Sequence, residues 1–398
     1  MKLLMLGTMV PRETRDYCFS MGQRIIPAEL VQDYMLHGLE DNQSVECIDS
    51  LGSVRIQAWP KSKIFVVKDS EESIKKGKAN GVGFVNLPIW GFLHRERAII
   101  REAKKWAKNH VSDSDVSVLI HSMHSPFMKA AKEIKQIIPS AKIVLLVADL
   151  PLFMDMRGSL RKLLKKTDWK RIKKLMPYVD KYLLYTKYMA EYLNISENKW
   201  MLFEGIIDES KIVGCRQKKF SEKVALYAGN LDARYGIDTL IDAFSKVKSD
   251  IKLYIYGAGF DAERVDRLTS NYSNVEYKGQ VSTEEIFEIM KKSTLLINPR
   301  PSGIGLAKYS CPSKTFEYMA SGTPLVMNRL PGLPDEYEPY VYFFSDEDSD
   351  SMARRIDELL ECGDDNLIDF GLKAADFLRE RKNSFVVMQN VVDFINEK

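Results

Sequence analysis

Apolar segments of three to five residues alternate with helical patterns along almost the whole 398-residue chain. In the first half the clearest segments are 3–6, 64–67, 116–120, 143–147 and 182–185, and in the second half 224–227, 253–256, 275–277, 295–297 and 325–327. Buried strands separated by helices are typical of α/β domains with largely parallel sheets. The chain is also too long for a single hydrophobic core, so we expect an α/β protein of two domains.

The alternation is interrupted once, near the middle of the chain. Residues 201–223 read MLFEGIIDESKIVGCRQKKFSEK, and their second part is polar and basic. We place the domain boundary in this linker and predict domains at 1–205 and 206–375. The last part of the chain looks wholly helical, so residues 376–398 are predicted to form a C-terminal helix that returns toward the first domain.

Composition is typical of a globular protein in the cytoplasm. Apolar residues make up 45% and charged residues 28%, and no apolar run approaches the roughly 20 residues of a membrane span. The start MKLLMLGTMVPRET is too short for a signal peptide and resembles a buried strand. The 5 cysteines are scattered without CxxC spacing, which indicates neither a disulfide framework nor a zinc site. With a net charge of only +3, we expect no nucleic-acid partner.

One segment of the first half combines positive charge with helical amphipathicity. Residues 157–181 contain ten Lys or Arg against two Asp, and apolar residues recur at helical spacing. Such a helix can lie on an anionic membrane surface, which predicts peripheral contact with the inner face of the plasma membrane. It can equally be a surface helix whose apolar side packs on its own domain.

The segment 298–326, NPRPSGIGLAKYSCPSKTFEYMASGTPLV, carries the clearest sign of chemistry. Ser310 can cap a helix, Pro312 suits the first turn, and Gly322 stands just beyond the expected end. A helix of about ten residues is therefore predicted here.

Three polar residues project from the start of that helix. Ser313, Lys314 and Glu317 occupy adjoining faces, near the end where free backbone N–H groups attract phosphate. A lysine can neutralise phosphate, and a carboxylate can accept hydrogen bonds from a ribose diol. Ordinary stabilisation of a helix start would use the same residue types, so spacing alone leaves both interpretations open.

Two further loops follow predicted strands in the same half. The first runs from Gly229 to Gly236 and includes Arg234, and the second contains Gly257. Glycines allow a ligand to approach the backbone closely, and ligands of open parallel sheets bind at the carboxyl ends of the strands. Together with the 298–326 segment, which also contains Arg300, these loops predict one cleft.

Read in order, these segments resemble the C-terminal donor domain of retaining glycosyltransferases of family 4. The resemblance covers roughly residues 222–345 and rests on the turn at Gly229, the helix start at 237–244, the turn at 256–259, residues 279–285 and the 298–326 segment. It implies the GT-B fold, with two Rossmann-like domains facing a cleft and C-terminal helices packing across both. It also implies that the second domain binds a nucleotide sugar, most commonly UDP-linked, and that the first binds the acceptor.

The resemblance assigns roles to individual residues. Glu317 would bind the ribose hydroxyls, and Ser313 and Lys314 would lie near the diphosphate. The full donor-binding set that it implies is Gly229, Asn230, Arg234, Tyr235, Gly257, Arg300, Tyr309, Ser313, Lys314 and Glu317.

The chain departs from the family pattern at three of these positions. Asn230 and Tyr235 stand where the family usually has a basic pair, which leaves Arg234 and Lys314 to neutralise phosphate. Tyr309 stands where a second, sugar-contacting Glu is usual. The resemblance therefore supports the nucleotide more firmly than the sugar.

The first half resembles the family only loosely. Such domains usually present a histidine after the strand that corresponds to 143–147, and here Asp149 is closest to that position. A carboxylate there would stabilise oxocarbenium charge or accept the proton of the acceptor hydroxyl, although Asp is also common in turns. His121 and His124 are competing bases, and we rank Asp149 first and His124 second.

Two Asp-x-Asp pairs raise the question of a metal. Asp113 and Asp115, and Asp346 and Asp348, lie in polar runs typical of solvated loops. We therefore predict that no metal and no cofactor is needed beside the nucleotide-sugar co-substrate.

The sequence thus predicts a metal-independent, retaining glycosyltransferase of the hexosyltransferase type. It would move a sugar from a nucleoside diphosphate, UDP first, to a glycan or lipid-linked acceptor in polysaccharide biosynthesis. A nucleotide-sugar epimerase or hydrolase of the same fold is an alternative, as is a non-catalytic nucleotide-sugar-binding partner subunit.

Overall fold

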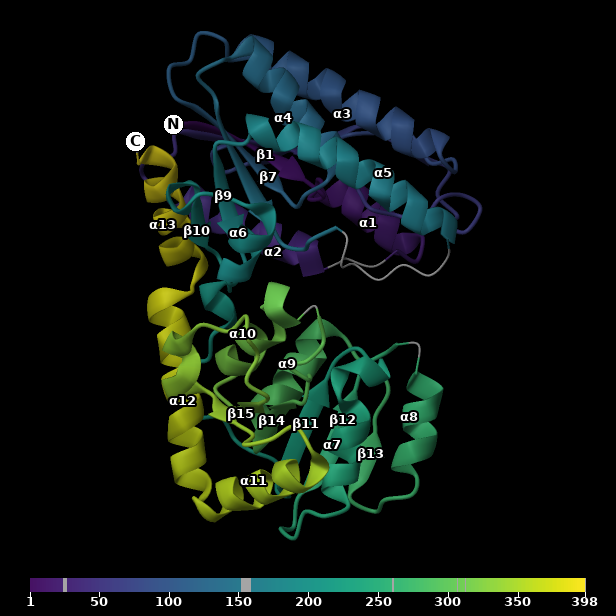
Figure 1. Cartoon of the computed structure of the whole chain (residues 1–398), viewed down its shortest axis with the longest axis vertical. Helices are drawn as coiled ribbons and strands as arrows, with labels where there is room; N and C mark the ends of the chain where they lie inside the picture. Colours follow the sequence, from purple (N-terminus) through teal and green to yellow (C-terminus); the bar gives the residue numbers. More distant parts are fainter. Residues whose placement is uncertain (24–26, 152–158, 260, 306, 312, 398) are drawn as a thin grey trace. The chain divides into compact units, whose positions relative to one another are not determined.

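The computed structural model describes residues 1–23, 27–151, 159–259, 261–305, 307–311 and 313–397, with the backbone alone for residues 27, 28, 159–164 and 313. The chain forms two compact units (Figure 1). Unit 1 comprises Met1–Ile206 and Ser384–Lys398, and unit 2 comprises Ile207–Asn383. Each unit contains one large sheet of mainly parallel strands with helices around it, which confirms the expected α/β fold.

Unit 1 is built on an eight-stranded sheet in which every neighbouring pair is parallel except β4 and β5 at one edge. The order is β10 (Trp200–Leu202), β9 (Lys181–Leu184), β8 (Lys142–Val147), β7 (Val116–His121), β1 (Lys2–Gly7), β2 (Cys47–Gly52), β5 (Gly77–Gly81) and β4 (Ser70–Ile74). The sequence predicts β1, β7, β8 and β9 but not the others. The missed strands, such as SEESI in β4 and GKANG in β5, lie toward the edges and need few apolar residues.

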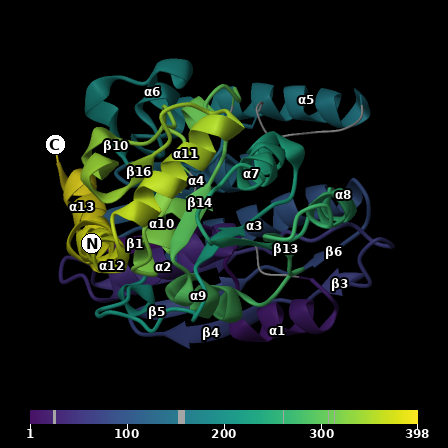
Figure 2. The ribbon, with the colours of Figure 1, turned by 90° about the horizontal axis from the view of Figure 1, so that it is seen from below.

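The predicted strand at 64–67 belongs to a different, smaller sheet. There β3 (Val66–Val67) pairs antiparallel with β6 (Phe84–Val85), and Figure 2 shows both close to α1 (Arg12–Ser20). Ile64 is completely buried in a separate small core that includes Cys18 and Phe84. Ile64 and Val67 therefore fill this core, and the apolar run at 64–67 does not extend the large sheet.

Helices cover both faces of the unit 1 sheet. One face packs on α2 (Pro27–Glu40) and α13 (Ser384–Asn396) through side chains such as Leu3 and Met5. The other packs on α3 (Trp90–Asn109) and α4 (Ser125–Ile137), while α5 (Ser159–Leu175) packs on α4 and α6 (Lys187–Leu193) contacts β9. Because both faces are buried, the central strands are continuously apolar.

Unit 2 contains a six-stranded sheet in which all strands are parallel. The order is β13 (Val275–Tyr277), β12 (Lys252–Tyr256), β11 (Val224–Ala228), β14 (Leu295–Asn298), β15 (Leu325–Met327) and β16 (Tyr342–Phe343). The sequence predicts all of these strands except the two-residue β16. The helices are α7 (Ile237–Phe244), α8 (Ala262–Thr269), α9 (Thr283–Lys292), α10 (Ser313–Ala320), α11 (Ser349–Glu361) and α12 (Asp364–Arg381).

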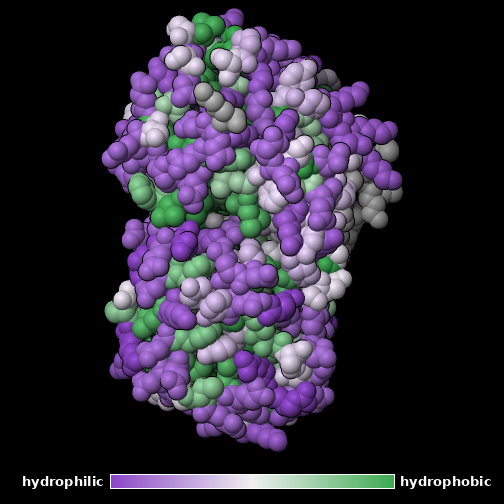
Figure 3. Space-filling model, turned by 60° about the vertical axis from the view of Figure 1, so that its left-hand side comes forward, coloured by the Kyte–Doolittle hydropathy of each residue, from purple (hydrophilic) through white to green (hydrophobic). Residues whose placement is uncertain are grey.

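The last two helices belong to different units. Helix α12 lies in unit 2 beside α10, and α13 lies in unit 1 beside α2. Gly38 permits the second contact, because a Cβ at this position would lie 2.1 Å from the Ser384 carbonyl oxygen. No helix in the described ranges is long and apolar enough to cross a membrane, and the face shown in Figure 3 is mostly hydrophilic with small hydrophobic areas.

Helix α10 ends as the sequence predicts. Gly322 has φ +68, and its N–H donates to the Met319 carbonyl at 3.1 Å. A Cβ at this position would lie 2.5 Å from Cγ2 of Val213. The left-handed backbone and the lack of space both require glycine.

We expect Gly322→Ala to lower the free energy of unfolding by about 1–3 kcal/mol, because alanine is strained at this φ and displaces Val213. Chemical denaturation would measure the change. Gly303→Ala is the matched control, since a Cβ there meets no atom within 4 Å, and it should stay within about 0.5 kcal/mol of the wild type. Equal stabilities of the two variants would contradict this role of Gly322.

Candidate functional site

Three loops of unit 2 meet at the carboxyl ends of β11, β12 and β14, because these strands are neighbours in the sheet. The loops begin at Gly229, Gly257 and Pro299. Gly257 has φ +143, and a Cβ on it would lie 1.8 Å from the Gly229 carbonyl oxygen. The first two loops therefore approach each other through their backbones, which glycine alone allows.

Lys314 reaches from the first turn of α10 to the end of β11. Its Nζ donates to the Ala228 carbonyl at 2.6 Å and lies 5.5 Å from the centre of the Tyr227 ring. A Cβ on Gly229 would lie 1.8 Å from Nζ, so the glycine provides the space for the ammonium group. Burial lowers the pKa of Lys314 to about 8, against the attraction of Glu317. The site thus holds a poorly solvated cation at the strand ends.

A cavity of about 200 Å³ opens beside this lysine. It is lined by Tyr227, Asn230, Tyr235, Asn298, Arg300, Lys314 and Tyr318. Asn230, Tyr235, Arg300 and Lys314 belong to the donor-binding set predicted from the sequence. The other lining residues, Tyr227, Asn298 and Tyr318, do not belong to that set. The fully buried Tyr318 hydroxyl donates to the Ala228 carbonyl at 3.0 Å and accepts from the Ala228 N–H at 2.8 Å, which fastens α10 to β11.

Arg300 is the second cation of the cavity. Its Nη2 donates to Ser310 Oγ at 2.9 Å, and its guanidinium carbon lies 5.7 Å from the centre of the Tyr235 ring. Ser310, which the sequence suggests as a helix cap, therefore also positions this arginine. Lys314 and Arg300 both carry positive charge and N–H donors and line the same cavity, so the cavity suits an anionic ligand.

The other predicted donor residues are not among the described lining residues of this cavity. Half-buried Glu317 stands in the same helix as Lys314, and burial raises the pKa of its carboxyl group despite the attraction of Lys314. Tyr309 ends the short 3-10 helix η5 (Ala307–Tyr309), and Ser313 begins α10 with its side chain outside the description. Exposed Arg234 donates to both carboxylate oxygens of Asp232, at 2.9 and 2.6 Å.

The candidate catalytic residues of unit 1 lie at the carboxyl ends of the paired strands β7 and β8. His121 ends β7, His124 precedes α4, and exposed Asp149 follows β8. Burial lowers the pKa of His121 to about 4. Burial, with the nearby charges of Arg95 and Arg55, lowers the pKa of His124 to about 3. Both histidines are therefore neutral at pH 7, and Asp149 carries the accessible carboxylate.

His124 lies in apolar surroundings, with the rings of Phe92 and Phe127 at 6.2 and 5.4 Å between centres. Its Nδ1 is buried and has no hydrogen-bond partner within the described part of the chain. The folded protein therefore resists protonation of this imidazole, whereas the unfolded chain binds the proton near pH 6.5.

The unfolding free energy should therefore fall as the pH drops below 6.5, since the pKa of His124 is depressed in the folded state. We expect a loss of at most about 1.4 kcal/mol per pH unit from this group. Chemical denaturation at pH 7 and pH 5 should show that the unfolding free energy decreases less on acidification in His124→Gln than in the wild type. His94→Gln, at an exposed position on α3, is the control for the loss of a histidine. Equal slopes for His124→Gln and wild type would refute the prediction.

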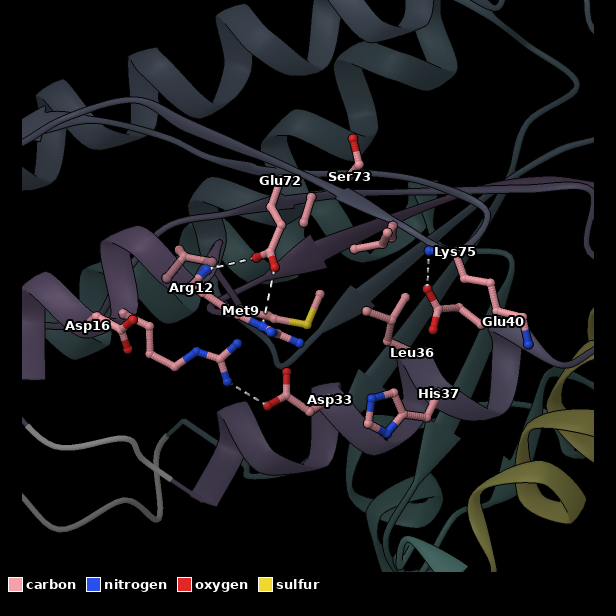
Figure 4. A pocket seen from close by; sticks show the side chains of 14 residues that line it. Met9, Arg12, Asp16, Asp33, Leu36, His37, Glu40, Glu72, Ser73 and Lys75 are labelled. Carbon is pink, nitrogen blue, oxygen red and sulfur yellow. Dashed lines mark hydrogen bonds and ion pairs between the residues drawn. The ribbon is translucent and has the colours of Figure 1, made fainter.

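Unit 1 contains a second cavity, of about 600 Å³, which the sequence analysis does not foresee (Figure 4). It lies between α1, α2 and the β4–β5 pair. Arg15 bonds Asp33 at 3.0 Å, and Arg12 bonds Glu72 at 3.3 Å. Burial raises the pKa of Asp33 despite the nearby Arg15. Because both arginines face a carboxylate, this cavity suits polar, uncharged ligands better than a diphosphate.

The two Asp-x-Asp pairs have structural partners. Asp113 bonds Lys2 at 2.9 Å, and Asp115 lies 3.6 Å from the chain's first amino group. Asp346 accepts from the Glu347 N–H at 2.8 Å, and Asp348 caps α11 by accepting from Ser351 N at 2.8 Å.

The basic segment 157–181 forms α5 over Ser159–Leu175, and residues 152–158 lie outside the described ranges. Ile172 is completely buried, and Arg171 Nη2 lies 3.0 Å from the Glu96 carboxylate. Among the helix residues whose side chains are described, four lysines are exposed, namely Lys166, Lys170, Lys173 and Lys174. The described part of the helix therefore packs at least part of its apolar side on its own unit and presents its basic side to solvent.

Comparisons with solved structures identify the fold class. The lipopolysaccharide outer core galactosyltransferase WaaB aligns over 99% of both chains, with a TM-score of 0.63 and 16% identity. Anabaena HepE in complex with UDP-glucose aligns over 99% of this chain and 98% of its own, with a TM-score of 0.63 and 13% identity. Similarity at this identity shows the fold alone, which is the GT-B fold of glycosyltransferases.

The family comparison concerns the second half of the chain. Residues 222–362 match the family "Glycosyl transferases group 1". An uncharacterized glycosyltransferase of Methanocaldococcus jannaschii is 28% identical over 191 residues, which cover 45% of this chain and 46% of the relative. The alignment thus spans about half the length of that curated relative. Both findings support the expectation of a glycosyltransferase, and the family match includes the strand ends, Lys314 and Arg300.

Proposed function

We propose that the protein is a retaining glycosyltransferase that binds a nucleoside-diphosphate sugar, with UDP as the nucleotide, at the strand ends of unit 2. The observation that carries the proposal is the convergence of Lys314 and Arg300 on one cavity beside Gly229. The family match over the same residues and the similarity to HepE, whose structure contains UDP-glucose, support it.

In this proposal the two cations neutralise the diphosphate without a metal. The guanidinium of Arg300 offers paired N–H donors that match phosphate oxygens, and Lys314 offers a point charge. Gly229 provides the space in which the Lys314 ammonium group lies, and Gly257 allows the two loops to approach each other there. The Glu317 carboxylate accepts hydrogen bonds from the ribose hydroxyls. These hydrogen bonds favour its ionised form, which burial disfavours.

We further propose that unit 1 supplies the acceptor and the proton chemistry. The bond between the anomeric carbon and the phosphate oxygen breaks, and a new bond forms to the acceptor hydroxyl oxygen. Asp149 stabilises the developing positive charge of the sugar or accepts the hydroxyl proton, and it is accessible for this role. His124, neutral at pH 7, is the second candidate and acts by hydrogen bonding.

The proposed acceptor is a glycan or a lipid-linked sugar of polysaccharide biosynthesis, used in the cytoplasm at the inner face of the plasma membrane. The exposed lysines of α5 support the lipid-linked choice, since basic residues near an anionic surface each contribute about 1 kcal/mol. Incubation with UDP-sugars tests the reaction type. Sugar transfer requires an added acceptor, whereas an epimerase or hydrolase consumes the donor alone.

Glu317→Ala should weaken UDP binding by about 1–3 kcal/mol, because the ribose hydroxyls lose a partly buried, charged acceptor. Isothermal titration calorimetry with UDP would measure the loss. Glu284→Ala is the matched control, since Glu284 is an exposed glutamate in the first turn of α9, another helix of unit 2. Unchanged UDP affinity in Glu317→Ala would remove Glu317 from the site.

UDP affinity should also fall as the pH rises above 8. Lys314 has a pKa of about 8 without ligand, and a bound diphosphate raises this pKa. Above pH 8, binding of UDP therefore requires uptake of a proton by Lys314, which weakens the affinity as the pH rises. Between pH 7 and pH 9 we expect a loss of about tenfold, because the protonated fraction of free Lys314 falls by that factor. Lys314→Met should bind UDP more weakly at pH 7 and lack this additional pH dependence. A wild-type affinity that does not change between pH 7 and pH 9 would contradict the assignment of Lys314.

A further inference from the structure

An exposed apolar surface lies on residues 59–66 and on residues 89–93 at the start of α3 in unit 1, outside the two cavities described above. We call it the loop surface. It consists of six large apolar side chains, each more than a third exposed, namely Trp59, Phe65, Val66, Ile89, Trp90 and Leu93. Ile89 and Trp90 are 78% and 69% exposed. Single exposed apolar residues are ordinary, but a group of this size marks an interaction site.

A buried asparagine holds the two loops together. The side-chain amide of Asn86 donates to the carbonyls of Gln57 and Ile64, at 2.8 and 2.9 Å. Its backbone N–H donates to the Phe65 carbonyl at 2.8 Å, and its carbonyl accepts from the Trp59 N–H at 2.9 Å. The loop surface is therefore one ordered surface, and it includes Val66 of β3, which pairs with Val85 of β6.

The backbone at Ile89 is strained. Ile89 has φ 62 and ψ −57, and the Trp90 N–H donates to the Pro88 carbonyl at 2.6 Å, which defines a classic γ-turn. A β-branched residue is rare at positive φ, where glycine would be favoured. The strained backbone holds the apolar side chain of Ile89 in solvent, where it gains no stabilisation from burial. We infer that the stabilisation that offsets the strain comes from a contact with a partner outside the chain.

The loops around this surface carry mainly positive charge, and exposed Asp69, directly after the first segment, accepts a hydrogen bond from the Gly83 N–H at 2.7 Å. The sequence has no Asp or Glu from 53 to 68 or from 82 to 95. Four basic residues of the first segment are exposed, namely Arg55, Lys61, Lys63 and Lys68. Glu96, the first acid after the second segment, is buried and bonds Lys129 at 2.8 Å and Arg171 at 3.0 Å.

We propose that the loop surface binds an anionic lipid bilayer. Ile89 and the two tryptophans would enter the interfacial region, where tryptophan is favoured, while Lys61 and Lys63 meet the headgroups. A second copy of the chain is a poorer partner, because it would present the same positive charge. This surface is separate from α5. Ile172 of α5 is completely buried, so what α5 offers to a membrane is the positive charge of its exposed lysines.

The loop surface also lies near the carboxyl edge of the unit 1 sheet. The ring of Phe92, in the first turn of α3 between Trp90 and Leu93, is 6.2 Å from the ring of His124. If the proposed function is correct, membrane binding brings this edge close to a lipid-linked acceptor. Membrane binding itself does not depend on that function, and it is tested without donor or acceptor.

Co-sedimentation of the full chain with vesicles tests the proposal. We expect binding to vesicles of phosphatidylglycerol and phosphatidylcholine, weaker binding to pure phosphatidylcholine, and a decrease with added salt. Ile89→Gly is the most informative variant, because glycine relieves the strained backbone and leaves the fold at least as stable as in the wild type. It should bind anionic vesicles about tenfold more weakly. Thermal unfolding would confirm that its stability is retained.

A double lysine variant tests the electrostatic contribution to binding, and a control variant tests an exposed apolar residue elsewhere in unit 1. Lys61→Glu with Lys63→Glu should remove the preference for anionic vesicles, with a loss of at least about fivefold for each residue. Val111→Ser is the matched control, because Val111 is 58% exposed but lies beyond the other end of the twenty-residue α3. It should bind as the wild type does.

Three results would overturn the proposal. The first is wild-type binding that does not distinguish anionic from neutral vesicles. The second is wild-type affinity in both Ile89→Gly and the double lysine variant, with loss only in Lys170→Glu with Lys173→Glu, which would assign the contact to α5. The third is a change of molecular mass in Ile89→Gly by light scattering without vesicles, which would show that the surface joins two copies.

Discussion

The close approach of Lys314 to the end of β11 is the contact on which the candidate site depends. Its ammonium group bonds the Ala228 carbonyl in a space that exists because residue 229 has no side chain. The parallel register brings β12 and β14 beside that same strand end, so Gly257 and Arg300 join the site. A cation that burial has largely desolvated, with a second cation lining the same cavity, is suited to a phosphate group.

Unit 1 uses its polar groups differently. Its two histidines at the strand ends are buried and neutral, while Asp149 remains at the surface. Its charged cavity balances arginines against carboxylates. The loops tied by Asn86 expose apolar and basic side chains together. We therefore interpret unit 1 as the part of the chain that contacts the acceptor and its surroundings, and unit 2 as the part that binds the nucleotide.

Much of the fold could be predicted from the sequence because central parallel strands are buried on both faces. Such strands, for example β8 with KIVLLV, are nearly continuous apolar runs. Edge strands such as β5, with GKANG, have no such signature, since pairing with one neighbour does not require apolar side chains. The segment at 64–67 was apolar for another reason, because Ile64 fills a small separate core.

The sequence by itself determined the α/β class, the order of the strand-end loops and the presence of Lys314 and Glu317 at a helix start. Local pattern sufficed there, because periodicity and capping act over a few residues. Only the tertiary structure distinguished Arg300, which lines the cavity, from Arg234, which bonds the nearby Asp232. Likewise, the bond between Lys314 and Ala228 joins residues 86 positions apart. Such contacts arise from strand register and side-chain packing between distant segments, which local sequence patterns do not encode.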